Sequence, residues 1–375
     1  MRKKVAIIIP TKNNSNCLIE LLNYYAGVKS KHTIYIGDAS DPKYLAETMP
    51  VIESLSSIIN IVHKQYPELN RGVIDNLATV KRMLGFVKEE YTVYSGDDDY
   101  YIPHSLDKCV DFLENNPDYS CAHGFGHFVS YNESEGASNI SGRYDINEYE
   151  GDSGTERFKT LMNSYSPLLF SVHRKEIFMK IYRNIELLTN TTLTELMPVG
   201  LSSILGKSKR LNKLYLIRGV HKQREQQPTL IVKICDPEWS QSLQVYLNTL
   251  TEEIKTVDRV DEKDAMQIIK QGFCVYLEMS MARLYCKKDI LSSARNIIEL
   301  VLQGVRMSVP LFIKNFVRNN ILSFNSDQKP YGVFINTPKQ LSKSSPYYLE
   351  FISVLSAFDR MSKKNKQMVD YAKSE

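Results

Sequence analysis

From Lys4 to about Ser130 the chain alternates short β-branched apolar runs with longer segments in which apolar residues recur every three or four positions. The short runs predict strands, and the longer segments predict helices. Strands are expected at residues 5–9, 33–37, 59–63, 91–95 and 119–123, with helices near 18–25, 44–55, 73–87 and 106–113. Because this alternation is typical of βαβ units, we predict an α/β fold with a mostly parallel sheet.

The pattern changes beyond this part of the chain. Residues 132–154 are rich in Asn, Ser, Gly, Asp and Glu, which predicts a long loop. Helical periodicity returns at 193–205, and one more strand is expected at 214–217. After about residue 236 helical patterns dominate. We therefore predict two domains, an α/β domain at 1–230 and a mainly α-helical region at 231–375.

The composition narrows the class of protein. Lys and Arg number 47 against 43 Asp and Glu, and this small net charge of +4 leads us to expect no nucleic-acid partner. The 6 cysteines are scattered without a CxxC pair, as is typical of reduced thiols in the cytoplasm. Since no apolar run reaches the roughly 18 residues of a membrane span, we expect a cytoplasmic protein that is at most peripheral at the inner face of a membrane.

Three consecutive carboxylates, Asp97, Asp98 and Asp99, follow the apolar run 91–95. Open α/β sheets bind ligands at the carboxyl ends of their strands. Adjacent carboxylates repel one another, and a divalent cation such as Mn²⁺ or Mg²⁺ would offset that repulsion. The alternative is a solvated acidic turn that caps the helix beginning near Pro103. Position alone leaves both interpretations open.

Other predicted strands also end in polar residues. The first ends at Pro10 and Thr11, and the second is followed by Asp38. Arg71 precedes the helix at 73–87, where a guanidinium beside a helix N-terminus suits a diphosphate. Each of these residues alone is more often a cap or a turn, but together they predict a ligand site at one edge of the sheet.

This series of elements resembles the inverting glycosyltransferases of the GT-A fold, in the broad family-two class. The matching segments are Ile7–Asn14, Ile36–Asp41, Asn70–Gly72 and Ser95–Asp99, the last of which matches the family's DXD motif. The resemblance covers about residues 4–225. It implies a Rossmann-like GT-A domain that binds a nucleotide sugar, and it does not cover the helical remainder.

The resemblance also implies roles for single residues. The nucleotide-sugar contacts it implies are Pro10, Thr11, Asp38, Arg71, Lys81, Asp97 and Asp98, with Thr11 and Asp38 beside the nucleoside and Arg71 or Lys81 on the phosphate side. Asp99 would be the direct metal ligand, with Asp97 and the late histidine His221 as further ligands of Mn²⁺ or Mg²⁺. Which two of the three aspartates form the functional pair stays open, and His221 could equally be structural or exposed.

An inverting transfer needs a base that takes the proton of the acceptor hydroxyl. The family supplies an Asp or Glu at the start of a helix below the sugar, and Glu195 is the matching residue here. The alternative is a capping box, with Thr192 as N-cap and Glu195 three residues later. The position of Glu195 relative to the DXD motif favours the base.

The expected activity is therefore metal-dependent transfer of a hexose-type sugar from a nucleoside diphosphate, with UDP favoured, to a glycan, lipid-linked or protein acceptor. By analogy with the family, the pathway would be bacterial surface glycan biosynthesis. One alternative is a nucleotidyltransferase, which the absence of a Gly-rich phosphate loop disfavours. Another is a non-catalytic scaffold whose helical region binds a partner.

The helical region contains apolar stretches with interspersed cations at 297–306 and 311–318. Such a pattern suits a peripheral contact with an anionic membrane surface, where a lipid-linked acceptor would lie. It suits ordinary core packing or a homodimer interface as well, and packing is the commoner role of amphipathic helices.

Overall fold

The computed structural model describes residues 3–69, 73–132, 137–220, 233–282 and 348–372. The chain groups into two compact units, Met1–Phe273 with Ile335–Glu375, and Cys274–Phe334. The elements described below lie in the first unit. The predicted domain boundary at residue 230 stays a prediction.

A mostly parallel sheet forms the centre of the first unit. Its strands are β1 (Val5–Thr11), β2 (Thr33–Asp38), β3 (Ile61–Gln65), β4 (Tyr91–Tyr94), β5 (Asp99–Tyr101), β6 (Tyr119–Asn132), β7 (Ala137–Tyr144), β8 (Val172–Arg174) and β9 (Lys207–Val220). The strand order is β3-β2-β1-β4-β8-β6-β9-β5, and β7 pairs with β6. Strands β3, β2, β1 and β4 are parallel, as are β6 and β9, whereas β5, β7 and β8 run antiparallel to their neighbours. The predicted α/β fold is confirmed.

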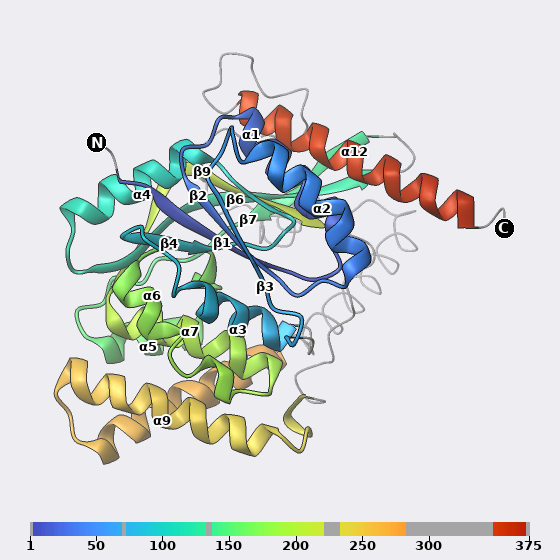
Figure 1. Ribbon diagram of the computed structural model, residues 1–375. Coiled ribbons are helices and arrows are strands. Elements are labelled where there is room, and N and C mark those ends of the chain that lie inside the picture. Colours follow the sequence, from blue (N-terminus) through green and yellow to red (C-terminus); the bar gives the residue numbers. More distant parts are fainter. Residues whose placement is uncertain (1–2, 70–72, 133–136, 221–232, 283–347, 373–375) are drawn as a thin grey trace, which may run out of the picture. The chain divides into compact units, whose positions relative to one another are not determined.

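Helices cover both faces of this sheet. They are α1 (Ser15–Gly27), α2 (Pro42–Leu55), α3 (Val73–Met83), α4 (Pro103–Asn115), α5 (Gly154–Asn163), α6 (Lys175–Ile181), α7 (Thr191–Leu205), α9 (Trp239–Asp258) and α12 (Tyr348–Ala372), with 3₁₀ turns η1 (Leu168–Phe170) and η2 (Ile185–Leu187). Figure 1 shows α1 and α2 on one face and α3, α6 and α7 on the other. This division follows from right-handed crossovers that lead outward from β1 to β3 and then back to β4.

The two-sided cover explains why the first strand is apolar throughout. Residues 5–9 of β1 are fully buried, as expected for a strand with helices above and below it. Leu18, Leu21 and Leu22 of α1 lie on one side of that helix and are also buried. The strand and the helix therefore share one core, which fixes the loop between them.

The loop predicted at 132–154 is wrong for residues 137–144, which form strand β7. In the β6–β7 pair, Ser130 lies opposite Asn139 and Val129 lies opposite Ile140. The polar residues of β7 form a strand because their backbone pairs with the long strand β6, although they lack an apolar side-chain pattern. Polarity alone was therefore a poor guide to this segment.

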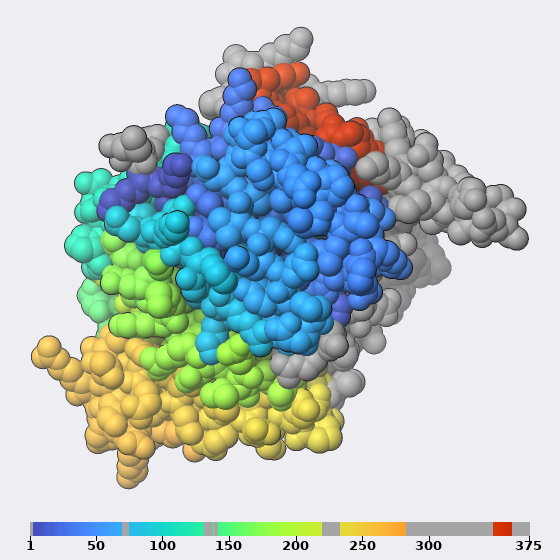
Figure 2. Space-filling view, viewed as in Figure 1, coloured from blue at the N-terminus to red at the C-terminus, as the bar shows by residue number. Residues whose placement is uncertain are grey.

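The predicted helical C-terminal region is confirmed for the described residues, and its helices complete the α/β core. Helix α12 packs on α1, where both Nε and Nη2 of Arg360 lie 2.7 Å from Oε2 of the buried Glu20. Figure 2 shows α12, in red, against the blue N-terminal surface. Helix α9 packs on α5 and α7. No helix in the described part of the chain is long and apolar enough to cross a membrane.

Candidate functional site

The loops that follow β1 and β4 meet at Asp97. Thr11 Oγ1 donates to one carboxylate oxygen of Asp97 at 2.7 Å, and Asn14 Nδ2 donates to the other at 2.8 Å. Asn14 is the N-cap residue of α1, but its side chain makes no capping hydrogen bond. The first crossover thus orients Asp97 from two sides, whereas the sequence predicted Thr11 as a nucleoside contact and assigned no role to Asn14.

Asp98 and Asp99 both fold back over Gly96. A Cβ placed on Gly96 would lie 2.9 Å from Oδ1 of Asp98 and 2.8 Å from Oδ2 of Asp99. A side chain at position 96 would therefore require these carboxylates to shift. The run does not cap α4, because the N-cap of that helix is Ile102 and makes no side-chain capping bond. The capping alternative is therefore wrong.

Asp99 begins strand β5 and pairs with a residue of strand β9. Arg218 of β9 donates from Nε to Oδ1 of Asp99 at 2.8 Å and from Nη2 to Oδ2 at 3.4 Å. The guanidinium lies 4.1 Å from the ring centre of Phe170 and 4.9 Å from that of Tyr144. Asp99 is thus held in a buried ion pair.

The surroundings of Asp97 shift the pKa of its carboxyl group. Burial and, next, the adjacent charge of Asp98 raise the pKa of Asp97 to about 7, and the hydrogen bonds from Thr11 and Asn14 oppose the shift only in part. An ionised carboxylate in this position is stabilised by added positive charge. Asp97 and Asp98 are half-buried, so their oxygens fit a divalent cation that takes its other ligands from phosphates and water. Among the described residues no group of three or more His, Cys, Asp or Glu side chains could hold a metal ion.

The loops after β1 and β2 are joined by hydrogen bonds. Asn13 has a left-handed backbone with φ 53°, a conformation that Asn tolerates better than most residues. Its Oδ1 accepts from the backbone of Asp41 at 2.8 Å, its Nδ2 donates to the Asp41 carboxylate at 3.0 Å, and its backbone donates to Ser40 Oγ at 2.8 Å. These residues were not predicted as site residues, although an Asn in a strand-to-helix turn is a signal for such geometry.

Asp38 ends β2 and is almost fully buried. It accepts hydrogen bonds from the backbone of Ser40 at 2.9 Å and lies 3.1 Å from Nε2 of His63. Burial raises the pKa of Asp38, but the bonds from His63 and Ser40 outweigh it and leave the pKa below its ordinary value. Pro10 lies beside Gly37 in the β1–β2 register, so both strand ends reach the same edge.

The predicted phosphate contacts are not brought to the acidic run by the described contacts. Lys81 lies in the last turn of α3, where its Nζ is 2.6 Å from Oε2 of Glu186 in η2. Arg71 and His221 lie outside the described residues.

Glu195 lies on α7 and is exposed. Tyr165 donates its hydroxyl to Oε1 of Glu195 at 2.5 Å. The N-cap of α7 is Asn190, whose side chain accepts from the backbone of Thr192, so Thr192 and Glu195 do not form the capping box considered from the sequence. The capping explanation of Glu195 is wrong, and the carboxylate stays available for chemistry.

Glu195 and the acidic run act on the same tyrosine. Burial raises the pKa of Tyr144, the charge of Arg218 opposes this shift, and the charges of Asp99 and Glu195 add to it. Glu195 therefore lies within electrostatic range of Tyr144, the ring against which Arg218 packs.

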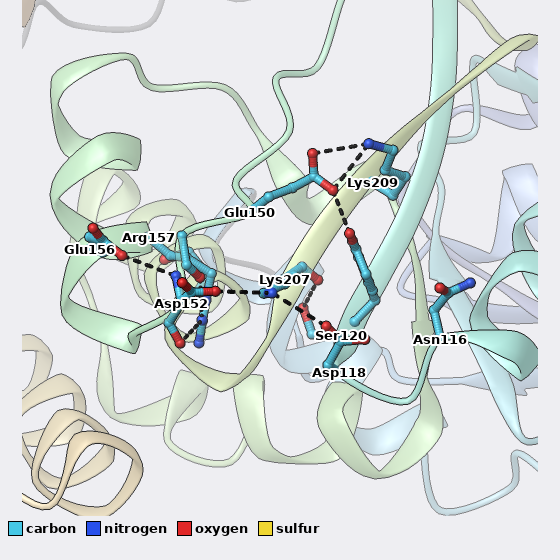
Figure 3. Close-up of polar contacts among 12 residues, drawn as sticks. Asn116, Asp118, Ser120, Glu150, Asp152, Glu156, Arg157, Lys207 and Lys209 are labelled. Carbon is cyan, nitrogen blue, oxygen red and sulfur yellow. Dashed lines mark hydrogen bonds and ion pairs between the residues drawn. The ribbon is translucent and has the colours of Figure 1, made fainter.

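A second polar cluster lies at the other end of the sheet, where β6 and β9 begin (Figure 3). Lys207 lies 3.4 Å from Asp118 and 3.3 Å from Asp152, and Lys209 lies 3.0 Å from Glu150. Its cations and carboxylates are paired with one another, which is typical of structural ion pairs rather than of a ligand site.

Comparisons with known proteins found similar folds only among solved structures. No family model and no curated sequence matches the chain. The crystal structure of S. aureus TarS 1-349 in complex with UDP-GlcNAc aligns with a TM-score of 0.49 and 13% identity, covering 97% of this chain and 92% of that one. The structure of TarS 1-349 alone aligns with a TM-score of 0.47 and 15% identity, covering 97% and 91%. Against a longer TarS chain, the match has a TM-score of 0.47 and 17% identity and covers 74% of this chain but only 43% of that one.

Proposed function

We propose that this chain is an inverting glycosyltransferase of the GT-A type that transfers a sugar from a nucleoside diphosphate to an acceptor hydroxyl. The observation that carries the proposal is the convergence of Thr11, Asn14 and Asp97 where β1 and β4 end. Ligands of open α/β sheets bind at this edge. The raised pKa of Asp97 indicates a carboxylate arranged to receive a cation or a hydrogen-bond donor from outside the chain.

The donor half of the site would use the loops after β1 and β2, which are hydrogen-bonded to each other. Thr11 and Pro10 lie at the start of that surface, and Asp38 with His63 would support the nucleoside from beneath. A carboxylate accepts from the ring N–H of uracil, and UDP is the nucleotide we would test first. Asp97 and Asp98 would hold Mn²⁺ or Mg²⁺, which when bound supplies positive charge to the departing diphosphate.

The acceptor half would use Glu195 as the general base. Its carboxylate is exposed, and the hydroxyl of Tyr165 fixes one of its oxygens. An exposed oriented carboxylate can take the proton of an acceptor hydroxyl as that oxygen attacks the sugar. A surface glycan or a lipid-linked sugar is the acceptor class we propose.

Calorimetric titration of UDP, GDP, dTDP and CDP, each with and without Mn²⁺, tests the donor half. We expect one nucleotide to bind in a metal-dependent manner to the wild type, and the Asp97→Asn variant to lose at least about tenfold in affinity. Asp118→Asn is the matched control, because it removes a carboxylate from the opposite end of the sheet.

Binding of one nucleotide that survives Asp97→Asn unchanged would remove Asp97 from the site. A folded wild type that binds none of the four nucleotides would overturn the glycosyltransferase proposal. For the acceptor half, Glu195→Gln should keep nucleotide affinity while losing sugar transfer, since a base acts on the acceptor rather than on the donor.

A further inference from the structure

Helix α12 joins the α/β core from the far end of the chain. It packs beside α1 and also contacts β6 and β7 (Figure 1). Phe351, Val354 and Phe358 are buried at a spacing of three or four residues, so one face of the helix belongs to the core. The backbone of Ser138 in β7 donates to Oδ1 of Asp359 at 2.7 Å, which fixes the register of α12 on the sheet.

The first link between α12 and the acidic run passes through Tyr100. This residue follows Asp99 in β5, so its side chain points to the face of the strand opposite the Asp99–Arg218 pair. Its ring centre lies 5.3 Å from that of Phe358 and 5.3 Å from that of Tyr24 in α1. Because Tyr100 is fully buried between these rings, a shift of α12 would be felt at the start of β5.

The second link passes through α1. Nε and Nη2 of Arg360 both lie 2.7 Å from Oε2 of Glu20, although the two residues are 340 positions apart. The side chain of Glu20 is only 4% exposed, so this carboxylate depends on a partner within the fold. Helix α1 begins directly after Asn14, which donates to Asp97. The ion pair therefore fixes the helix whose N-cap residue orients Asp97.

Helix α1 and strand β5 are also bonded to each other. The hydroxyl of Tyr24 donates to the carbonyl of Tyr101 at 3.0 Å, and the backbone of Tyr101 donates to the hydroxyl of Tyr25 at 3.4 Å. The two links from α12 therefore end on two elements that hold one another, next to the residues that orient the acidic run.

We propose that α12 positions the acidic run Asp97–Asp99 for its ligands, and that Phe358 and Arg360 are positioning residues of the donor site. Phe358 acts through β5, and Arg360 acts through α1. This inference rests on the proposed function and adds to the donor site a helix from the part of the chain that the family resemblance does not cover.

Hydrogen exchange of the full-length chain, without any ligand, tests the link through β5. Phe358→Leu removes the ring contact with Tyr100 but keeps an apolar side chain, so the backbone amides of residues 97–102 should exchange at least about tenfold faster than in the wild type. Phe158→Leu on α5 is the matched control, because Phe158 is also buried. It should leave the same amides within about twofold of the wild type.

Calorimetric titration of UDP with Mn²⁺ tests the link through α1. Arg360→Met leaves the buried Glu20 without its counter-charge and should weaken UDP binding at least about fivefold, whereas Glu20→Gln/Arg360→Met removes both charges and should restore it to within about twofold. Phe358→Leu should weaken binding as well. Leu349→Ala on α12 is the control that should change nothing, since Leu349 is 75% exposed. The side chain of Arg360 is 52% exposed, so its variants keep the test available even if Phe358→Leu does not fold.

Unchanged exchange in Phe358→Leu would overturn the inference. An equal rise in Phe158→Leu would overturn it too, because both buried phenylalanines would then act only through overall stability. Faster exchange with unchanged UDP affinity would show that α12 supports β5 but not the donor site, which also contradicts the inference. A wild type that binds no UDP would count against the proposed function, and the exchange comparison would then decide by itself whether α12 positions the acidic run.

Discussion

Strand β9 runs from one end of the sheet to the other, and its charged residues are used differently at the two ends. At the amino end, Lys207 lies within ion-pair distance of both Asp118 and Asp152 (Figure 3). At the carboxyl end, Arg218 faces a run of three aspartates and pairs with the last one.

The difference separates charges that are paired within the fold from charges that we propose face a ligand. Paired surface charges contribute little to stability and have no need of a further partner. Asp97, in contrast, is held by the neutral groups of Thr11 and Asn14, and its pKa is raised by burial and by Asp98. A site that opposes its own ionisation in this way is costly to the fold, and such costs are concentrated at functional sites.

The largest expected effect is at the amino end, at the buried Arg157 of α5. Its Nε donates to the carbonyl of Ser203 at 2.7 Å and its Nη2 to that of Ile204 at 2.7 Å, which caps the end of α7. Arg157→Met leaves these buried carbonyls without donors, so the free energy of unfolding should fall by about 3 kcal/mol in urea titrations.

Arg210→Met on β9 is the matched control for this loss. Arg210 is half-buried and lies 3.8 Å from Asp145, so its removal should cost less than about 0.5 kcal/mol. Equal losses in the two variants would mean that the capping of α7 by Arg157 is unimportant for stability.

A change of opposite sign is expected at the carboxyl end. In metal-free buffer, Asp97→Asn removes a charge that the fold disfavours and keeps a side chain of the same shape. The pKa of Asp97 is raised from 3.8 to about 7, so the stability that its proton confers is full below pH 3.8 and is lost as the pH rises to about 7. At pH 8 the variant should therefore be more stable than the wild type by about 1–3 kcal/mol.

Urea titrations at pH 8 and pH 4 measure this difference, which should be large at pH 8 and small at pH 4. An Asp97→Asn variant that is less stable than the wild type at pH 8 would show that Asp97 supports the fold. The comparison between the two ends of the sheet would then fail.

The sequence predicted the edge of the sheet but not the pairing across it. Local apolar runs and their polar ends placed Thr11, Asp38 and Asp97 together, because parallel strands carry their carboxyl ends to one edge. Arg218 could not be assigned to Asp99, since the two residues are 119 positions apart and only the β5–β9 register joins them.

Two further differences have local physical causes. The capping box at Glu195 was an alternative only while the start of α7 was taken as Thr192, and Asn190 instead caps that helix. Strand β7 was predicted as a loop because its side chains are polar, and pairing with β6 overrides that local preference.

The smallest expected effect concerns Glu150 at the amino end. Burial raises the pKa of Glu150, but the hydrogen bonds from Tyr119 and Lys209 outweigh it and lower the pKa below 4.5. The stability from this pairing is present above pH 4.5 and is lost as the pH falls through the lowered pKa. Because the side chain is only half-buried, Glu150→Gln should lower the free energy of unfolding by only about 0.5 kcal/mol at pH 7.

This loss should shrink as the pH falls below 4.5, and Glu53→Gln on the exposed side of α2 should show no such trend. The pH effects at Glu150 and Asp97 therefore have opposite signs. Acid removes the stability that the ionised Glu150 contributes, whereas it increases stability at Asp97 by neutralising a charge that the fold disfavours. If titrations of both variants gave the same sign, the carboxylates at the two ends would have the same role, and the acidic run would be one more set of structural charges.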